Sequence, residues 1–258
     1  MGKMDVYRRR LKQHFLGSPN RTISGLIRGE QRRGANVRGY QENNQTPGGR
    51  TMNGPDHIIF AVHGIHTGTN NWADPFQRWA ALHSPKIAIE ECDYGQVTAF
   101  QLRLCGWIPF LARRRFNQLA AFVREALQEY PEGTPYSFVG HSWGTWLVHG
   151  MLDRHHDIKP KSVVLIGSVL REEWKKTSFS KILERKQFMR MFVLFSKGDS
   201  VIERLSFYPY GKLGWLGFID EKPDCIEQLC VEESHGSYFS VSRRLIYFPL
   251  IEKFITRS

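Results

Sequence analysis

Residues 136–144 read Tyr-Ser-Phe-Val-Gly-His-Ser-Trp-Gly, and this stretch decides the fold that the sequence predicts. A short apolar run typical of a β-strand leads into a Gly-x-Ser-x-Gly pattern, and residues 145–154 then have the character of a helix. A strand that turns sharply into a helix holds its central side chain on an exposed, strained corner, and the flanking glycines let neighbouring backbone approach. The pattern therefore makes Ser142 a candidate nucleophile.

The five-residue pattern is weak evidence when it stands alone. With ordinary frequencies of Gly and Ser, about one chain in ten of this length contains it by chance. The alternative interpretation is a glycine-flanked turn with an ordinary capping serine. The decision rests on whether a histidine, an acid and a pair of backbone donors occur at suitable places elsewhere in the chain.

The composition is that of a globular protein. The chain has 258 residues, of which 41% are hydrophobic and 13% aromatic, enough for one large domain or two small ones. No apolar run approaches the ~20 residues of a membrane-spanning helix, and no signal-peptide core follows the basic start. We therefore expect a cytoplasmic protein. The four cysteines lack metal-ligand spacing, so we predict reduced thiols, no metal and no other cofactor.

The positive charge is concentrated near the N-terminus. The formal net charge is +11, and residues 1–56 carry 11 Lys and Arg against 4 Asp and Glu. Residues 17–55 have little apolar content, so they cannot offset the entropy cost of ordering. We predict a basic, largely flexible arm over residues 1–53 and one domain over 54–258. The first sixteen residues fit a basic amphipathic helix that contacts anionic membrane or nucleic acid, or a frayed, solvated terminus.

From Asp56 onward, short apolar runs alternate with longer helical patterns. Continuously apolar strands that alternate with helices predict an α/β fold, with a mostly parallel sheet of about six strands and helices on both faces. The predicted strands are His57–Val62, Ala88–Cys92, Tyr136–Val139, Ser162–Ile166, Met191–Phe195 and Ile226–Val231. The predicted helices are Trp72–Leu82, Phe116–Tyr130, Trp143–Arg154 and Ser240–Ile255.

Two further polar side chains follow predicted strands. Asp199 comes just after the fifth strand, and His235 comes just after the sixth, with a glycine beside it. In a parallel sheet, reactive side chains collect where strands end and loops begin. The chain order Ser, Asp, His is the one expected for a sheet of this type and differs from the two well-known protease orders.

From about Asp56 to the C-terminus, the chain resembles the α/β-hydrolase superfamily of lipases, esterases and related serine hydrolases. The resemblance is carried by the elbow at 140–144, by the segments 62–65 and 234–236, and by Gly198 with Asp199. It implies that Ser142 is the nucleophile, Asp199 the acid and His235 the base. Only six strands are found, so the first two of the usual eight are missing and the chain is a minimal version.

The acid has several alternatives in the sequence. Asp199 is also suited to cap a helix, because Asp is favoured at that position. The competing acids are Glu203, Asp220 and Asp224. The base has no comparable competitor, because none of the other nine histidines follows a late strand.

An acyl-transfer mechanism also needs donors for the negative oxygen of the tetrahedral intermediate. The elbow supplies the backbone N–H of Trp143. We assign the second donor to the backbone of Ile65, in the loop after the first strand, with His66 or Gly68 as alternatives.

Substrate contacts are predicted from two aromatic-rich inserts, Leu102–Phe110 and Phe207–Phe218. Both follow strand ends, so they either form an apolar cap over an acyl group or cover the edge of the sheet as core. On the first interpretation Trp107, Phe110 and Trp215 bind substrate.

The sequence thus predicts a serine hydrolase that cleaves carboxylic esters, with lipid, acyl or thioester substrates. Two alternatives stay open. One is a non-catalytic binding protein on a hydrolase scaffold, whose basic arm binds membrane or nucleic acid. The other is an amidase or peptidase that uses the same three side chains.

Overall fold

The structure is a computed structural model, and it describes residues 54–65, 72–92, 105, 108–205 and 210–257. The chain divides into two units, Met1–Met52 and Asn53–Ser258, and the described residues all belong to the second. The predicted arm lies outside the described residues, as do Trp107, His66 and Gly68. All that follows concerns the second unit.

Six strands form one parallel sheet in the order β2-β1-β3-β4-β5-β6. This confirms the predicted sheet, and each strand lies within about two residues of its predicted bounds. The strands are β1 (His57–Val62), β2 (Ile87–Cys92), β3 (Tyr136–His141), β4 (Ser162–Ile166), β5 (Arg190–Ser196) and β6 (Ile226–Val231).

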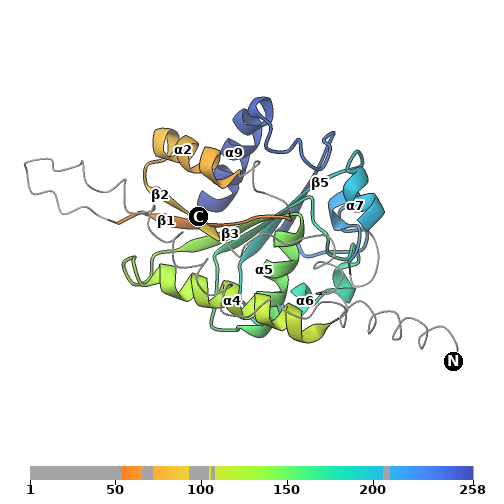
Figure 1. The fold of residues 1–258 in the computed structure, drawn as a ribbon, viewed down its shortest axis with the longest axis horizontal. Helices are drawn as coiled ribbons and strands as arrows, with labels where there is room; N and C mark the ends of the chain where they lie inside the picture. Colours follow the sequence, from red (N-terminus) through yellow and green to blue (C-terminus); the bar gives the residue numbers. More distant parts are fainter. Residues whose placement is uncertain (1–53, 66–71, 93–104, 106–107, 206–209, 258) are drawn as a thin grey trace, which may run out of the picture. The chain divides into compact units, whose positions relative to one another are not determined.

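Helices cover both faces of the sheet (Figure 1). On one face lie α2 (Ala73–His83) and α9 (Val241–Thr256), and on the other lie α4 (Pro109–Leu127), α5 (Trp143–Arg154) and α6 (Phe179–Glu184). The shorter elements are the 3-10 helix η3 (Trp174–Lys176) and the helices α7 (Ser200–Leu205) and α8 (Leu213–Leu216). The four elements η3, α6, α7 and α8 were not predicted, because runs of three to six residues are too short to show a helical period.

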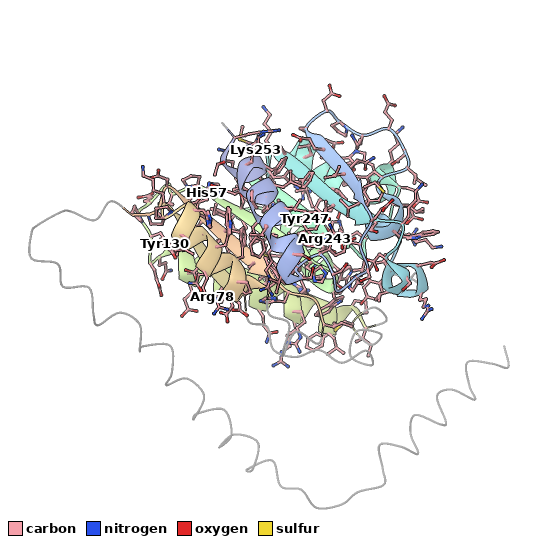
Figure 2. The ribbon with its side chains drawn as sticks, turned by 90° about the horizontal axis from the view of Figure 1, so that it is seen from above. His57, Arg78, Tyr130, Arg243, Tyr247 and Lys253 are labelled. Atoms are coloured by element: carbon pink, nitrogen blue, oxygen red, sulfur yellow. The ribbon has the colours of Figure 1, made fainter. Side chains whose placement is uncertain are left out.

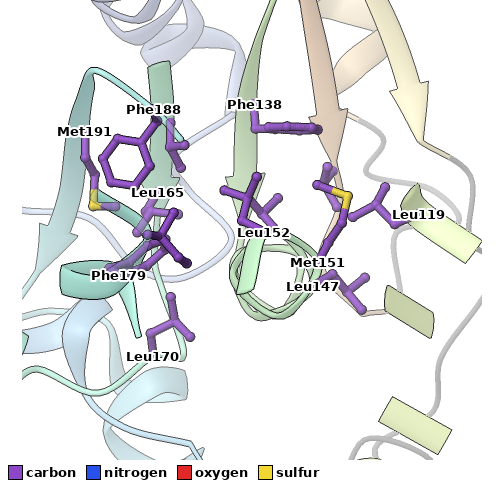
Figure 3. Close-up of a cluster of buried hydrophobic side chains, with 14 of the residues drawn as sticks. Leu119, Phe138, Leu147, Met151, Leu152, Leu165, Leu170, Phe179, Phe188 and Met191 are labelled. Carbon is purple, nitrogen blue, oxygen red and sulfur yellow. The ribbon is translucent and has the colours of Figure 1, made fainter. Parts of the chain in front are cut away.

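Each face of the sheet has its own hydrophobic core. One core joins the sheet to α4, α5 and α6, and the other joins it to α2 and α9. Figure 3 shows part of the first core, in which Leu147 and Met151 of α5 lie near Leu119 of α4. The middle strands are buried on both faces, as β1 and β4 show at every residue. This double burial explains why their sequences are continuously apolar rather than alternating.

Helix α4 is longer than predicted because it begins at Pro109, seven residues before Phe116. Proline is favoured in the first turn of a helix, where its missing N–H costs no hydrogen bond. The arginines at 113–115 therefore lie inside the helix, and Ala112 is the one buried residue in the turns before Phe116, so this part shows no apolar stripe in the sequence. None of the described helices is long and apolar enough to cross a bilayer.

Because all six strands are parallel, their C-terminal ends lie at one edge of the sheet. We call this the carboxyl edge. The helices α2, α4, α5, α7 and α9 each follow the C-terminal end of a strand in the sequence, and therefore each begins at this edge. The predicted catalytic side chains all lie in loops or turns at this edge.

Candidate active site

The elbow at Ser142 is a sharp turn between β3 and α5. Ser142 has φ 54° and ψ −125°, and it is one of two non-glycine residues with positive φ among those described. An L-residue in this region is strained by about 1–3 kcal/mol, and such strain collects at functional sites. The side chain is 3% exposed.

Two glycines allow the chain to pack closely around this turn. A Cβ at Gly144 would lie 2.3 Å from the carbonyl oxygens of both Val62 and His63, so the first turn of α5 touches the end of β1. A Cβ at Gly64 would lie 2.8 Å from Cβ of Ser142 and 3.2 Å from its Oγ. The loop after β1 therefore runs directly against the candidate nucleophile.

Buried hydroxyls fix the elbow from behind. The hydroxyl of Thr145 donates to the carbonyl of Ser142 at 2.6 Å, and the hydroxyl of Ser168 donates to Thr145 Oγ1 at 3.0 Å. The Ser142 N–H donates to the carbonyl of Ile166 at 2.9 Å. The backbone of Ser142 is thus tied to both β4 and α5.

The structure brings Ser142, Asp199 and His235 together, although they lie far apart in the sequence. His235 Nε2 lies 2.8 Å from Ser142 Oγ, and His235 Nδ1 lies 2.8 Å from Asp199 Oδ2. Asp199 is fully buried, whereas the His235 side chain is 15% exposed. The imidazole of His235 therefore lies between the Ser142 hydroxyl and the Asp199 carboxylate, and the catalytic roles of the three residues remain predictions.

Asp199 also caps a helix, so both interpretations of this residue apply. Its Oδ1 accepts a hydrogen bond from the N–H of Ile202 in α7 at 3.0 Å, which leaves Oδ2 for His235. Of the competing acids, Glu203 and Asp224 are exposed. Asp220 accepts hydrogen bonds from the backbone of η3, away from His235.

A second imidazole packs against the candidate base. The rings of His141 and His235 are stacked, with centroids 5.0 Å apart, and His141 Nε2 lies 3.3 Å from the His235 carbonyl oxygen. Burial lowers the pKa of His141 well below its usual value, and the nearby His235 lowers it further. His141 is therefore neutral, its Nε2–H donates to the carbonyl, and it adds no charge beside the base.

The two predicted oxyanion donors are Trp143, which follows Ser142 directly, and Ile65, in the loop that contacts Ser142. Trp143 is the first residue of α5, so its N–H belongs to the positive end of the helix dipole. Its indole is fully buried and donates through Nε1 to the Tyr210 hydroxyl at 3.3 Å. Ile65 is half-buried and follows Gly64, which contacts Ser142. Both assignments remain predictions.

The predicted substrate residues divide three ways. Trp107 lies outside the described residues. Phe110 is 71% exposed on α4, in a surface hollow of about 530 Å³ whose described lining comes from α4 alone. Trp215 is half-buried beside the acid loop, where its Nε1 donates to the Lys197 carbonyl at 2.9 Å and the Lys212 ammonium lies 4.9 Å from its ring centroid.

Much of the second aromatic insert is core. Tyr210 and Phe218 are each 5% exposed and pack in the same core as α5, as does Leu213. The interpretation of this insert as core is therefore correct for these residues, and among its described aromatic residues the interpretation as a substrate cap is open for Trp215. In the described part of the chain no three His, Cys, Asp or Glu side chains gather as metal ligands.

Sequence reasoning missed several residues that hold the site. They are Thr145 and Ser168 behind the elbow, His141 against the base, and Ser196 and Glu233 between the acid and base loops. Buried serines and threonines carry no sequence signal, because the same residues are common in exposed turns. Among these five residues only Glu233 belongs to a type that is rarely buried, and it is 6% exposed. Its burial could not be predicted, because burial is not visible in the sequence.

Comparison with known families agrees with the fold and the elbow. A family model described as the alpha/beta hydrolase fold matches residues 58–214. The match spans more than half of the chain and includes β1, the elbow and the acid. The chain belongs to the alpha/beta hydrolase family. No curated protein matches the chain.

One solved structure shows the same fold at low sequence identity, and two others match with lower TM-scores. A cold-adapted esterase from an Arctic intertidal metagenomic library matches with a TM-score of 0.50 and 13% identity, over 79% of this chain and 84% of that one. A hydrolase of the alpha/beta superfamily from Xanthomonas campestris pv. campestris matches with a TM-score of 0.42 and 14% identity, over 76% and 98%. A carboxyl esterase from Bacillus coagulans matches with a TM-score of 0.44 and 11% identity, over 79% and 90%.

Proposed function

We propose that this protein is a serine hydrolase that cleaves carboxylic esters through an acyl-enzyme. The observation that carries the proposal is the pair of contacts at His235, 2.8 Å to the Ser142 hydroxyl on one side and 2.8 Å to the Asp199 carboxylate on the other. A histidine held in this way accepts a proton at Nε2 and is stabilised by the acid when it becomes charged.

The first half of the reaction forms the acyl-enzyme. Ser142 Oγ attacks the ester carbonyl carbon while its proton moves to His235 Nε2, and the carbonyl oxygen becomes an oxyanion. The backbone N–H groups of Trp143 and Ile65 donate to that oxyanion in this proposal. The bond to the leaving oxygen then breaks, and this oxygen takes the proton from His235 and departs as an alcohol.

The second half repeats the sequence with water. His235 Nε2 removes a proton from water, whose oxygen attacks the acyl carbon, and the proton returns to Ser142 Oγ as the acid product leaves. Asp199 remains ionised throughout, because its role is to orient the imidazole and stabilise its charge. The neutral His141 against the ring keeps a second positive charge away from the imidazolium.

A fluorophosphonate probe tests the proposal, because it reacts with an activated serine and not with an ordinary one. We expect one adduct per chain, located by peptide mass mapping to Ser142, together with hydrolysis of p-nitrophenyl esters. Heat-denatured protein is the control and should not react. An adduct on another residue, or no adduct in folded protein, would contradict the assignment.

The distribution of exposed apolar side chains favours a lipid or long-chain acyl substrate. Of ten large apolar side chains that are exposed in the described residues, six lie at or within the first two turns of helices that begin at the carboxyl edge: Ile108, Phe110, Val201, Val241, Leu245 and Ile246. Neither α4 nor α9 has an acidic residue in its first turn, and both carry arginines by the second. Exposed apolar side chains with arginines beside them are suited to bind the surface of an anionic membrane.

We therefore expect Leu245→Glu to lower turnover of long-chain esters in anionic vesicles by about 10-fold, since losing part of one leucine's burial weakens binding by about 1.4 kcal/mol. Turnover of the water-soluble p-nitrophenyl acetate should not change. Leu82→Glu is the matched control, because Leu82 is 81% exposed and ends α2 at the opposite edge. Equal losses in both variants would argue against a lipid-facing carboxyl edge.

The proposal extends to location and partners. A cytoplasmic location is supported by four free cysteines, one of them exposed. The basic arm over residues 1–53 is proposed to contact anionic membrane or nucleic acid. The affinity of the full chain for anionic vesicles and its affinity for nucleic acid are measured separately, each at two salt concentrations. The partner that the full chain binds more tightly is the one supported.

A further inference from the structure

The strands that carry the acid and the base separate just before the catalytic residues. Strands β5 and β6 pair from Met191 with Ile226 to Ser196 with Val231, which is the last pair of the ladder. Beyond it, one loop leads to Asp199 and the other leads to His235. No ladder hydrogen bond holds these two loops at a fixed distance from each other.

The hydroxyl of Ser196 continues the connection where the backbone ladder stops. It donates to the Glu233 carbonyl at 2.6 Å and accepts from the Glu233 N–H at 2.9 Å. It also accepts from the Gly198 N–H at 3.0 Å. A serine hydroxyl has one donor and two acceptor positions, so Ser196 uses its full capacity, and it does so with no exposed surface.

The two loops are in contact at this point. A Cβ placed on Gly198 would lie 3.2 Å from the Glu233 carbonyl oxygen and 3.4 Å from Ser196 Oγ. Gly198 is adjacent to Asp199, and Glu233 is two residues before His235. The contacts that fix the distance between the acid loop and the base loop therefore lie no more than three residues from Asp199 and His235.

The base loop is held on its other side by the Glu233 side chain. This buried carboxylate accepts hydrogen bonds from the hydroxyls of Tyr247 at 2.9 Å and Ser237 at 2.7 Å, and it forms an ion pair with Arg243 at 2.6 Å. Tyr247 and Arg243 lie close together on α9, as Figure 2 shows, with Lys253 towards the other end of that helix. Burial and the Glu233 carboxylate raise the pKa of Tyr247 to about 12, so its hydroxyl remains a donor.

We propose that Ser196 is a positioning residue that sets the distance between Asp199 and His235. This inference rests on the proposed serine-hydrolase function. Glu233 is fixed to α9 through its side chain and to β5 through its backbone, and the second of these attachments is the Ser196 hydroxyl. Without the hydroxyl, the N–H and the carbonyl of the buried Glu233 lose this partner, and so does the N–H of the exposed Gly198. The loops then have to separate or admit water to satisfy them.

The expected result of Ser196→Ala is a loss in kcat of about 10- to 100-fold with KM within a factor of about two, because a displaced catalytic group slows chemistry without removing substrate contacts. The rate of fluorophosphonate labelling should fall in parallel. The proton on His235 Nδ1, which gives a low-field NMR signal when held between histidine and carboxylate, should shift upfield or broaden.

Ser162→Ala is the matched control. Ser162 is also a fully buried strand serine, on β4, but its hydroxyl has no hydrogen-bond partner among the described residues. We expect the control to keep wild-type kcat and the wild-type NMR signal. Both variants are compared at a temperature where circular dichroism shows each to be fully folded, so that a loss of kcat reports geometry and not unfolding.

Wild-type kcat and an unmoved low-field signal in folded Ser196→Ala would overturn the proposal. So would an equal loss in Ser162→Ala, because the effect would then belong to any buried serine. Failure of the proposed function has a different signature, namely no turnover and no probe adduct in the wild-type protein, whatever the state of the low-field signal. The two failures are therefore distinguishable.

Discussion

Ser142→Ala is expected to lower kcat/KM for a p-nitrophenyl ester by about 10⁴-fold or more and to abolish the fluorophosphonate adduct. The reason is geometric. Ser142 Oγ lies 2.8 Å from His235 Nε2, and among the described residues no other hydroxyl forms a hydrogen bond with that nitrogen. Steady-state kinetics and intact-protein mass spectrometry on both proteins give the comparison.

The fold should survive this substitution. Alanine has the same Cβ as serine, so the backbone strain at φ 54° is unchanged. Ser142→Gly tests the strain itself, because glycine occupies positive φ freely. We expect Ser142→Gly to be as inactive as Ser142→Ala but to unfold at a higher temperature. Retention of more than a few per cent of the activity in either variant would show that another nucleophile does the chemistry.

The elbow illustrates what the sequence reveals well. Ser142, Asp199 and His235 each follow an apolar strand, and the alternation of strands and helices places all strand ends at one edge. Their location at one edge of the sheet is therefore a consequence of topology, which periodicity can predict, whereas their roles were implied by the resemblance to the hydrolase superfamily. The structure also places Gly64 beside Ser142, because β1 and β3 are paired and Val62 lies opposite Gly140, and this strand order was not predicted.

What holds the three side chains at fixed distances was not predictable. Ser196 acts through a single hydroxyl that bonds the backbone of Glu233 on a distant loop, and Thr145 acts through one that bonds the nearby Ser142 carbonyl. Nothing in the local sequence distinguishes them from a serine or threonine in an exposed turn. The start of α4 was predicted too late because its first two turns bury only Ala112, so the helical period of buried residues becomes visible only from Phe116 onward.

The second large effect is expected at Gly144, which lies in the first turn of α5. An alanine in a helix normally stabilises a protein by about 1 kcal/mol relative to glycine. Here the added Cβ would lie 2.3 Å from the carbonyl oxygens of Val62 and His63, and both are backbone atoms that no rotamer change can move. Gly144→Ala therefore has to push α5 away from the end of β1.

We expect Gly144→Ala to lower the free energy of unfolding by more than about 3 kcal/mol, measured by urea denaturation, because overpacking against backbone has no cheap relaxation. The protein that remains folded should also lose activity, since moving α5 moves the N–H of Trp143 away from the oxyanion. Gly236→Ala is the control. It lies next to His235, yet a Cβ there meets no heavy atom within 4 Å. If both variants unfold like the wild type, the close approach of α5 to β1 is absent, and with it the geometric basis for Ser142 as a nucleophile.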